Sequence, residues 1–531
     1  MFEVKATDLA GRVGKLRTKS GVLETPCILP VVHPARQSIA PREMAKLGFD
    51  AVMTNAYITL KVFGKMAEEK GIHKIIDYDG TIMTDSGGYQ LLKYGNIDVT
   101  PKEMAVFQEK IGSDMALVLD TPTGIDVDRR RASETIRITL KAAKETLESA
   151  KGGGTLWVGP IQGGSYLDLL KKSAELTGKM RFDIFALGSP TEVMEAYNFV
   201  LLAKMIITTK QALPIDKPLH LFGAGHPLTI PLAVALGCDL FDSASYILYA
   251  REGRYITDYG TARLDELTYL PCNCPVCSEY TLKEIENLEF EERIQRIAVH
   301  NLNVLSKEIR TTKQAIRDGR LWEYLGIKAK AHPRLWHAFN LLGDYGKFLE
   351  DGTPSFKPKA IFFYEHNDLV RPEALRHHRK VLEDLSMVRK KLLVLPESDV
   401  KPFYKSSFYT RLAKALGNAL EDFQVCFLTL PFGMVPLELS DVYPLSQYLS
   451  SLKPDRHVMG ETLKHIREFV SKNAFERIIL LDLPDACSPI FKKMARSIKN
   501  CHKIDATGSD LDRVVRDING ARKPSFLDFL A

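Results

Sequence analysis

The chain has 531 residues, which is too long for one hydrophobic core, so we expect two or three domains. Its 45% hydrophobic and 26% charged residues are ordinary for a soluble globular protein, and charged residues such as Lys204 interrupt every apolar run before it reaches membrane-spanning length. The formal net charge of +6 permits a nucleic-acid partner without requiring one, and the first residues lack a signal-peptide core, which favours a cytoplasmic protein.

Strand-like and helix-like segments alternate through the first half of the chain. The repeat is roughly 30 residues long, which is the rhythm of a (β/α)8 TIM barrel, an α/β fold. An open doubly wound sheet is the alternative, but the Gly-rich phosphate fingerprint expected after its first strand is missing. The predicted strands are residues 28–33, 51–57, 81–85, 116–120, 156–162, 184–188, 218–224 and 240–246, and the predicted helices include 41–47, 101–111, 131–149, 166–177 and 191–208.

Polar residues and glycines collect where these predicted strands end, which is where a barrel places its chemistry. Asp85 follows one strand beside a Gly-Gly pair, and Asp242 ends another before small hydroxyl residues. Either aspartate alone could instead cap a turn or helix. Two carboxylates at two strand ends favour a nucleophile and its acid/base partner. The other strand-end residues suit a flat, purine-like base, and they are Asp120, Gln162, Gly163, Gly164, Gly188, Ser189, Gly223, Ala224, Gly225 and His226.

A compact cysteine motif follows the barrel repeat. Cys272, Cys274 and Cys277 lie within six residues, and a charged helix predicted over 282–299 brings His300 back over them. In a reducing compartment this pattern favours a metal over disulfides, and CxCxxC with a distant histidine is typical of a Cys3His zinc site. Because the protein would supply all four ligands, we expect one structural Zn2+ per chain. Catalytic zinc and a plain thiol cluster are the alternatives.

A basic helix is predicted directly after the zinc motif. Between Lys307 and Arg334 eight Lys or Arg residues stand against three acids, and aromatic residues are interleaved with them. This pattern predicts a phosphate-binding surface beside the active site, although a solvated helix face explains it equally well. The RNA-binding candidates are Arg310, Lys313, Arg317 and Arg320.

These patterns divide the chain into four parts. Residues 1–264 form the catalytic barrel, 265–350 the zinc-binding subdomain with its basic helices, 351–359 a Pro/Gly/Ser-rich linker, and 360–531 a separate α/β (α+β) extension. The extension has no visible catalytic constellation, and its basic, aromatic stretch at 401–407 is slightly better explained as a turn than as an RNA contact. Its predicted strands are 361–364, 391–395, 424–428 and 477–481, and its predicted helices are 408–419, 460–472 and 488–497.

Three motifs, in the expected order, resemble those of the tRNA-guanine transglycosylases. They are TDSGGYQ at 84–90, FDSAS at 241–245, and CxCxxC with His300, and the resemblance covers about residues 1–345. FDSASY and the long extension, with its stretches at 362–364 and 371–373, make the chain look like the archaeal, archaeosine-type branch. The extension is also similar to the lyase-like domain of archaeosine synthase, from which we carry over no activity. The small C-terminal PUA domain usual in that branch is not recognisable.

The resemblance implies exchange of guanine at position 15 in the tRNA D-loop for 7-cyano-7-deazaguanine, by two displacements at one ribose carbon. Asp242 would be the nucleophile and Asp85 the general acid/base. Asp120 would bind the amino edge of the base, and Gln162 and the Gly188 amide its oxygen edge, with Ser86 and Gly87 nearby. The implied partners are tRNA, the two bases and a second copy bound through the zinc region; the PUA module is either a separate protein or not needed. Residues 360–531 are expected to have a tRNA-binding or accessory role.

Three rival functions remain open on the sequence. A catalytically silent tRNA-binding subunit would keep the fold, but both aspartates are retained here. A zinc hydrolase would need an open metal position, whereas this motif fills all four. A queuosine-type enzyme would act on the wobble guanine of the anticodon, and only the branch-level resemblance separates it from the archaeosine type.

Overall fold

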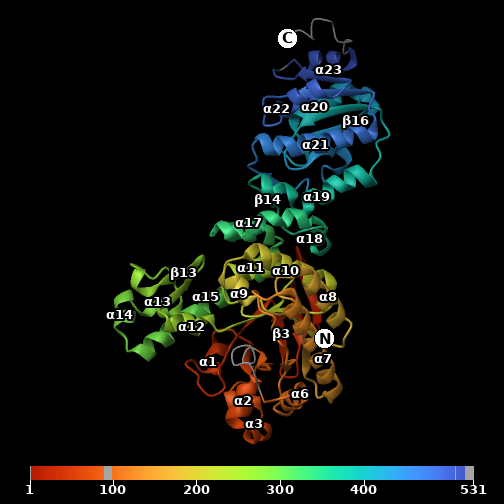
Figure 1. Ribbon diagram of the computed structural model, residues 1–531. Coiled ribbons are helices and arrows are strands. Elements are labelled where there is room, and N and C mark those ends of the chain that lie inside the picture. The colour runs from red at the N-terminus through yellow and green to blue at the C-terminus, as the bar shows by residue number, and fades with distance from the viewer. Residues whose placement is uncertain (1, 89–97, 509, 521–531) are drawn as a thin grey trace. The chain divides into compact units, whose positions relative to one another are not determined.

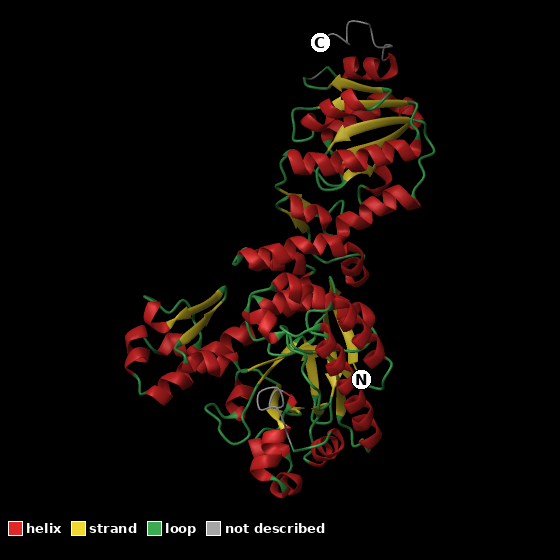
Figure 2. Ribbon diagram, in the orientation of Figure 1, coloured by secondary structure: helices red, strands yellow, loops and turns green. Residues whose placement is uncertain are grey.

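The computed structural model describes residues 2–88, 98–508 and 510–520 and divides the chain into two compact units, Met1–Leu342 and Gly343–Ala531 (Figure 1). Both units mix helices and strands (Figure 2). Within the described ranges, no helix is long and apolar enough to cross a membrane. The last two residues of the TDSGGYQ motif, Tyr89 and Gln90, lie outside the described residues.

Eight parallel strands form the barrel predicted for the first unit. They are hydrogen-bonded in the order β5-β6-β7-β8-β9-β10-β11-β4. Val31 pairs with Met53 and the Val32 N–H donates to the Met53 carbonyl at 2.7 Å, which joins the two end strands. An open sheet would have no such bridge, so the barrel is confirmed. The strands are β4 Cys27–Pro30, β5 Ala51–Asn55, β6 Thr81–Asp85, β7 Met115–Leu117, β8 Leu156–Ile161, β9 Ile184–Leu187, β10 Leu219–Leu221 and β11 Leu240–Ser243.

A small antiparallel sheet covers the amino-terminal end of the barrel. It consists of β1 (Phe2–Asp8), β2 (Gly11–Arg17) and β3 (Val22–Thr25), and β3 leads directly into β4. Its apolar side chains belong to the same buried cluster as those of the barrel interior, so the chemistry is left to the carboxyl ends of the strands. The cluster comprises Leu16, Leu23, Leu29, Ala51, Met53, Met83, Met115, Leu117, Val158, Ile184, Ala186 and Leu240.

Helices connect the strands of the barrel. The single helix predicted over 191–208 is wrong, because the structure has two helices there. Tyr197 adopts a left-handed φ of 53°, which interrupts the helix, and Asn198 starts the second one by accepting the Leu201 N–H at 3.2 Å. The helices are α1 Pro41–Lys46, α2 Ala56–Phe63, α3 Lys65–Lys70, α4 Ile72–Ile76, α6 Pro101–Lys110, α7 Arg129–Ser149, α8 Leu167–Gly178, α9 Thr191–Glu195, α10 Phe199–Ala212, α11 Thr229–Ala235 and α12 Ser245–Arg251.

After the barrel, a hairpin and several helices carry the cysteine motif. β12 (Arg254–Thr257) pairs antiparallel with β13 (Gly260–Arg263). The helix predicted over 282–299 is wrong as one element: α14 (Leu282–Asn287) has its own capping box, and α15 (Phe290–Asp318) follows it. At 1.5 Å per residue α15 is roughly 43 Å long, and it packs against α12 and also against β1 and β2. The other elements are η1 Leu264–Glu266, α13 Pro275–Glu279, α16 Leu321–Ala329, α17 Pro333–Leu341 and η2 Leu342–Tyr345.

The second unit is built on a five-stranded sheet in the order β17-β16-β15-β19-β20. All pairs are parallel except β16 with β17, and a separate parallel pair joins β14 to β18. The four predicted strands are present, and 401–407 contains the short turn η5 (Phe403–Lys405) with Phe403 buried. The strands are β14 Ile361–Phe363, β15 Lys391–Pro396, β16 Phe423–Thr429, β17 Gly433–Pro436, β18 Tyr448–Ser450, β19 Arg477–Asp482 and β20 Cys501–Asp505.

The helices of this unit begin before the predicted extension does. Residues 351–359, predicted as a linker, are an ordered part of the unit, because Lys357 is buried and its Nζ lies 2.5 Å from Glu373 Oε1. The composition of this stretch resembles a linker, but an ion pair to a distant residue holds it. The elements are α18 Gly346–Gly352, η3 His366–Val370, α19 Pro372–Arg379, η4 Lys380–Asp384, α20 Ser407–Leu416, η6 Gly417–Asp422, η7 Leu437–Leu439, α21 Arg456–Asn473, α22 Ser488–Ser497 and α23 Leu511–Gly520.

Candidate active site and metal centre

A cavity of about 930 Å3 opens at the carboxyl ends of the barrel strands, and both Asp85 and Asp242 line it. Asp85 is the last residue of β6 and Asp242 lies near the end of β11. The cavity wall also includes Asn55, Gly223 and Ser245. Parallel strands therefore bring two carboxylates, far apart in the sequence, to one hollow large enough for a nucleotide.

Two donors hold one oxygen of Asp242. His220 Nε2 donates to Asp242 Oδ1 at 2.9 Å, and the Gly223 N–H donates to the same oxygen at 3.0 Å. His220 belongs to β10, which pairs with β11, and it is completely buried. Among the described residues no protein donor bonds Oδ2, so this oxygen is left to meet a substrate. The arrangement suits a carboxylate nucleophile with a fixed orientation.

Asp85 has a different environment. Asn55, its neighbour in register on β5, donates from Nδ2 to Asp85 Oδ2 at 2.7 Å. Burial raises the pKa of Asp85 to about 6, and the negative charge of Asp242 also acts to raise it, although bonds from Gly87 and Asn55 oppose them. A carboxyl with such a pKa exchanges protons near neutral pH, as an acid/base catalyst must. Ser86, beside it, is buried and donates to the Val118 carbonyl at 2.9 Å.

Asp120 and Gln162 form a buried pair next to Asp85. Gln162 Nε2 donates to Asp120 Oδ2 at 2.5 Å, and its Oε1 accepts from the Thr123 N–H and the Ser189 hydroxyl. Burial raises the pKa of Asp120 to about 7, and the charge of Asp85 adds to this effect. Among the described residues that line the cavity, neither Asp120 nor Gln162 appears.

Gly188 differs from the expectation that its amide would bind a base. Its N–H already donates to the Ile161 carbonyl at 2.8 Å, within the strand pairing of the barrel. The glycine is needed for another reason, because a Cβ here would lie 2.3 Å from Gln162 Nε2. Gly188 therefore makes room for the Gln162 side chain.

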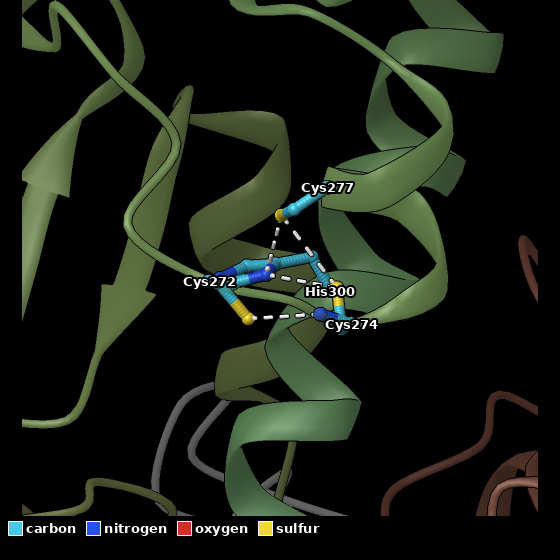
Figure 3. Close-up of side chains that lie close together, drawn as sticks. All are labelled: Cys272, Cys274, Cys277 and His300. Carbon is cyan, nitrogen blue, oxygen red and sulfur yellow. Dashed lines mark hydrogen bonds between the residues drawn. The ribbon is translucent and has the colours of Figure 1, made fainter.

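The four residues of the cysteine motif converge, with His300 supplied by α15 (Figure 3). Their ligand atoms all lie within 4.8 Å of one another. His300 Nδ1 lies 3.4 Å from Cys274 Sγ and 3.3 Å from Cys277 Sγ, and those two sulfurs are 3.6 Å apart. A tetrahedral ion with sulfur and nitrogen ligands has edges of about 3.5 to 3.8 Å, so Cys272, Cys274, Cys277 and His300 fit one metal ion.

The surroundings of His300 orient it for metal binding. Its Nε2–H donates to the Ile256 carbonyl at 2.8 Å, which leaves the Nδ1 lone pair facing the cysteines. Tyr255 stacks on the imidazole with ring centroids 3.6 Å apart and places its hydroxyl 3.1 Å from Cys277 Sγ. Neither catalytic aspartate candidate contributes to this cluster, so the cluster is consistent with a structural metal.

A family model described as "Queuine tRNA-ribosyltransferase" matches residues 8–334, more than half of the chain. The chain belongs to the tRNA-guanine transglycosylase family. It is thus a pentosyltransferase, and the archaeal relatives suspected from the sequence are found. Proteins named tRNA-guanine(15) transglycosylase match from Methanocaldococcus jannaschii (42% identical over 84% of this chain and 68% of the relative), Sulfolobus acidocaldarius (40%, over 90% and 95%) and Pyrobaculum aerophilum (44%, over 84% and 89%). A "Domain of unknown function (DUF5591)" model matches residues 375–513.

Two polar residues of the transglycosylase site escaped the sequence reasoning. Asn55 was included within a predicted apolar strand, although it ends β5 as Asp85 ends β6. His220 lies between two leucines in β10, where a lone histidine is typical of a core position. The signal for Asn55 was its place at a strand end, whereas His220 had no signal beyond being polar in an apolar strand.

The basic residues of α15 are not beside the transglycosylase site, so that expectation is wrong. Lys313 and Arg317 pair with Glu24 at 3.2 and 2.9 Å, and Arg310 donates to the Leu47 carbonyl at 3.4 Å. These three line a separate cavity with Cys27 and other residues where strands begin, the opposite end of the barrel. The helical spacing of these residues predicts that they share one face of α15, but it does not predict where that face lies. Because α15 is long, this part of it lies away from the carboxyl ends of the barrel strands.

Two exposed arginines do stand at the rim of the active-site cavity. Arg36 follows β4 and Arg251 ends α12, and both line the cavity. Both arginines act on nearby His33. Burial lowers the pKa of that histidine, and the positive charges of the two arginines lower it further. In the described part of the chain no ion pair joins either arginine to an acid. They are the cations best placed to meet phosphates of a bound polynucleotide.

Proposed function

We propose that this transglycosylase exchanges guanine at position 15 of tRNA for 7-cyano-7-deazaguanine, the archaeosine precursor. The observation that carries the proposal is that Asp85 and Asp242 line one cavity. Asp85 has a raised pKa that suits proton transfer, and Asp242 has one carboxylate oxygen held by His220. The names of the relatives, tRNA-guanine(15) transglycosylase, support the position on the tRNA. Retention of both aspartates argues against a catalytically silent subunit.

The proposed reaction has two displacements at ribose C1′. Asp242 Oδ2 attacks C1′, the bond from C1′ to the guanine nitrogen breaks, and Asp85 gives its proton to the leaving base. The ester between Asp242 and RNA keeps the backbone intact. Asp85 then takes a proton from the incoming base, whose nitrogen attacks C1′ and releases Asp242. Two inversions at C1′ give net retention of its configuration. The atoms balance without ATP and without a redox cofactor.

We assign base binding to the buried group next to Asp85. The pair Asp120–Gln162, together with Ser86 and Gly87, adjoins the proposed proton donor, and an ionised Asp120 would accept from the amino edge of the base. Gly188 supports Gln162 in this scheme. Arg36 and Arg251 would bind the phosphates flanking the flipped nucleotide, while Arg310, Lys313, Arg317 and Arg320 would act at most on RNA that reaches the far end of the barrel. The metal of the Cys3His cluster would be Zn2+, which the donor set favours.

The first test is trapping of the covalent intermediate. Asp242→Asn should abolish the RNA–protein adduct on denaturing gels while the affinity for tRNA is retained, and Asp168→Asn, an exposed aspartate on α8, is the matched control. Asp85→Asn should slow exchange by roughly 10²- to 10⁴-fold, the usual contribution of a positioned proton donor. In the wild type, adduct formation should fall as pH rises above about 6, because Asp85 must be protonated to donate. Adduct of normal yield in Asp242→Asn contradicts the mechanism.

The second test concerns the target guanine. The family model carries the name of an enzyme that uses queuine, so a wobble-position guanine is the competing substrate. Exchange of labelled guanine should persist on a tRNA that lacks its anticodon arm and disappear when position 15 is replaced. Loss of exchange on removal of the anticodon arm alone would assign the enzyme to the wobble position instead.

A further inference from the structure

One helix of the second unit has an exposed face whose charged residues are all cations. α22 (Ser488–Ser497) buries Ile490, Phe491 and Met494 in the core of that unit. Its outer face and the turn that follows it expose four lysines and arginines, and between Asp485 and Asp505 the sequence has no acidic residue. We define the α22 face as Lys492, Lys493, Arg496 and Lys499.

This face differs from the exposed faces of α7 and α21, where acids accompany the cations. On α7, Lys141 and Lys144 each pair with a glutamate four residues further on. On α21, exposed Lys464 and Arg467 are interleaved with Glu461 and Glu468. Among the described residues, no ion pair joins any of the four cations of the α22 face to an acid. A solvated helix face normally mixes its charges, as those helices do.

The arrangement also has a cost within the fold. On α22, Lys492 and Arg496 are four residues apart and Lys493 and Arg496 are three apart, so both pairs repel. Nothing in the described part of the unit relieves this repulsion by pairing. The first and last of the four cations are seven residues apart, roughly 10 Å at a helical rise of about 1.5 Å per residue, which suits a polyanion better than a single small anion. An external polyanion would therefore gain from the contact and relieve the repulsion.

We propose that the α22 face binds the phosphate backbone of the substrate tRNA, giving the second unit an RNA-binding role separate from the chemistry of the barrel. The proposal rests on the proposed function only in taking tRNA as the polyanion. Its physical basis is release of counterions from RNA by unpaired cations, a contribution that depends on salt and not on sequence. An anionic lipid surface is the other polyanion that such a face could meet, and the test separates the two.

The test compares two double variants of the full chain. Lys492→Gln/Arg496→Gln removes two cations of the α22 face, and Lys464→Gln/Arg467→Gln removes two exposed cations of α21 in the same unit. Binding of an unmodified tRNA transcript is measured at several salt concentrations. For the α22 variant, the slope of log affinity against log salt should shrink by about 1.4 to 1.8, since each of the two lost phosphate contacts contributes roughly 0.7 to 0.9. The α21 variant should keep the wild-type slope.

Thermal stability, exchange kinetics and vesicle binding distinguish RNA binding from other roles of the α22 face. The α22 variant should melt at the same temperature as wild type or higher, because repulsion is relieved, and its kcat for base exchange should be unchanged while KM for tRNA rises. An unchanged slope, or an equal change in the α21 variant, overturns the proposal. Loss of binding to phosphatidylserine vesicles with unchanged tRNA binding also overturns it, in favour of a membrane surface. If wild type shows no exchange at position 15 while the slope still shrinks, the proposed function fails and the RNA surface stands.

Discussion

At the scale of single residues, the two oxygens of Asp242 are not equivalent. His220 and the Gly223 N–H both bond Oδ1, and within the described residues no protein donor bonds Oδ2. A carboxylate that rotated freely would present either oxygen and spend part of its time misaligned. Fixing one oxygen aims the other, and proper aim of reacting atoms is a large part of what an active site supplies. His220 thus acts as a positioning residue in the proposed mechanism.

His220→Leu should slow formation of the RNA–protein adduct while leaving tRNA affinity unchanged. A hydrogen bond to a charged group contributes about 1.5 to 3 kcal/mol, so the expected loss is about 10- to 150-fold in rate. His220→Gln places an amide donor near the Nε2 position and should restore much of the rate. The measurement is single-turnover adduct formation with tRNA in excess. Equal rates in the leucine and glutamine variants would show that the donor is irrelevant.

Some residues of the candidate site could be predicted from the sequence, and others could not. The position of Asp85 and Asp242 in a cavity could be predicted, because an acid at the end of an apolar strand is badly placed for packing and well placed for a pocket. His220 was missed because its role depends on a partner 22 residues away on the next strand, which spacing along one strand does not reveal. The cations of α15 were misplaced because periodicity identifies a face without saying which part of the barrel the helix reaches.

At the scale of elements, α15 links the metal centre to the barrel. His300 is the eleventh of the 29 residues of α15 and lies beside the cysteines, and Asn301 Nδ2 donates to the Tyr246 carbonyl of α12 at 3.1 Å. α12 in turn begins three residues after Asp242 and contributes the rim residue Arg251. A metal bound at this cluster would therefore fix a helix that supports one wall of the active-site cavity without touching the reacting groups.

Cys274→Ser, or removal of the metal by a chelator, should lower the free energy of unfolding of the first unit before it lowers chemistry. Zinc content by mass spectrometry should fall to zero, and the melting temperature should drop. Exchange per folded molecule should stay near wild type at low temperature. Cys501→Ser, a partly buried cysteine of the second unit, is the matched control and should keep its metal. A folded, metal-free protein without activity would point to a catalytic metal instead.

Some element boundaries could be predicted from the local sequence pattern, and others depend on features that this pattern does not show. The eight barrel strands could be predicted because each is a locally apolar run. The break between α9 and α10 could not, since it depends on Tyr197 adopting a left-handed backbone that its side chain does not announce. Residues 351–359 had the composition of a linker, yet Lys357 is held by Glu373 from a helix further along the chain.

At the scale of the whole molecule, the two units have separate cores. One buried cluster belongs entirely to the second unit and another fills the barrel. Near the start of the second unit, Glu373 is completely enclosed with Lys357 and Arg371, whose distances to its carboxylate are 2.5 and 2.8 Å. Burial alone would raise the pKa of Glu373, but the two cations outweigh burial and hold it well below its usual range.

Glu373→Gln should therefore destabilise the second unit and spare the barrel. The substitution leaves two buried cations without their counter-charge, which costs about 3 to 5 kcal/mol in comparable sites. Because the folded pKa of Glu373 is depressed, wild type has the full stabilisation above the ordinary pKa of 4.5 and loses it as pH falls below that value. The variant should lack this acid-dependent loss.

Calorimetry of the full chain between about pH 3 and pH 7 would measure both the loss of stability and its pH dependence. The transition of the second unit should move to lower temperature in Glu373→Gln, while the transition that responds to a chelator stays in place. Glu461→Gln, at an exposed acid of α21 in the same unit, is the control. Adduct formation in the variant should match wild type at saturating tRNA, because the reacting groups lie in the barrel. If both transitions shift together, the two cores unfold as one, and the second unit stabilises the enzyme as well as binding RNA.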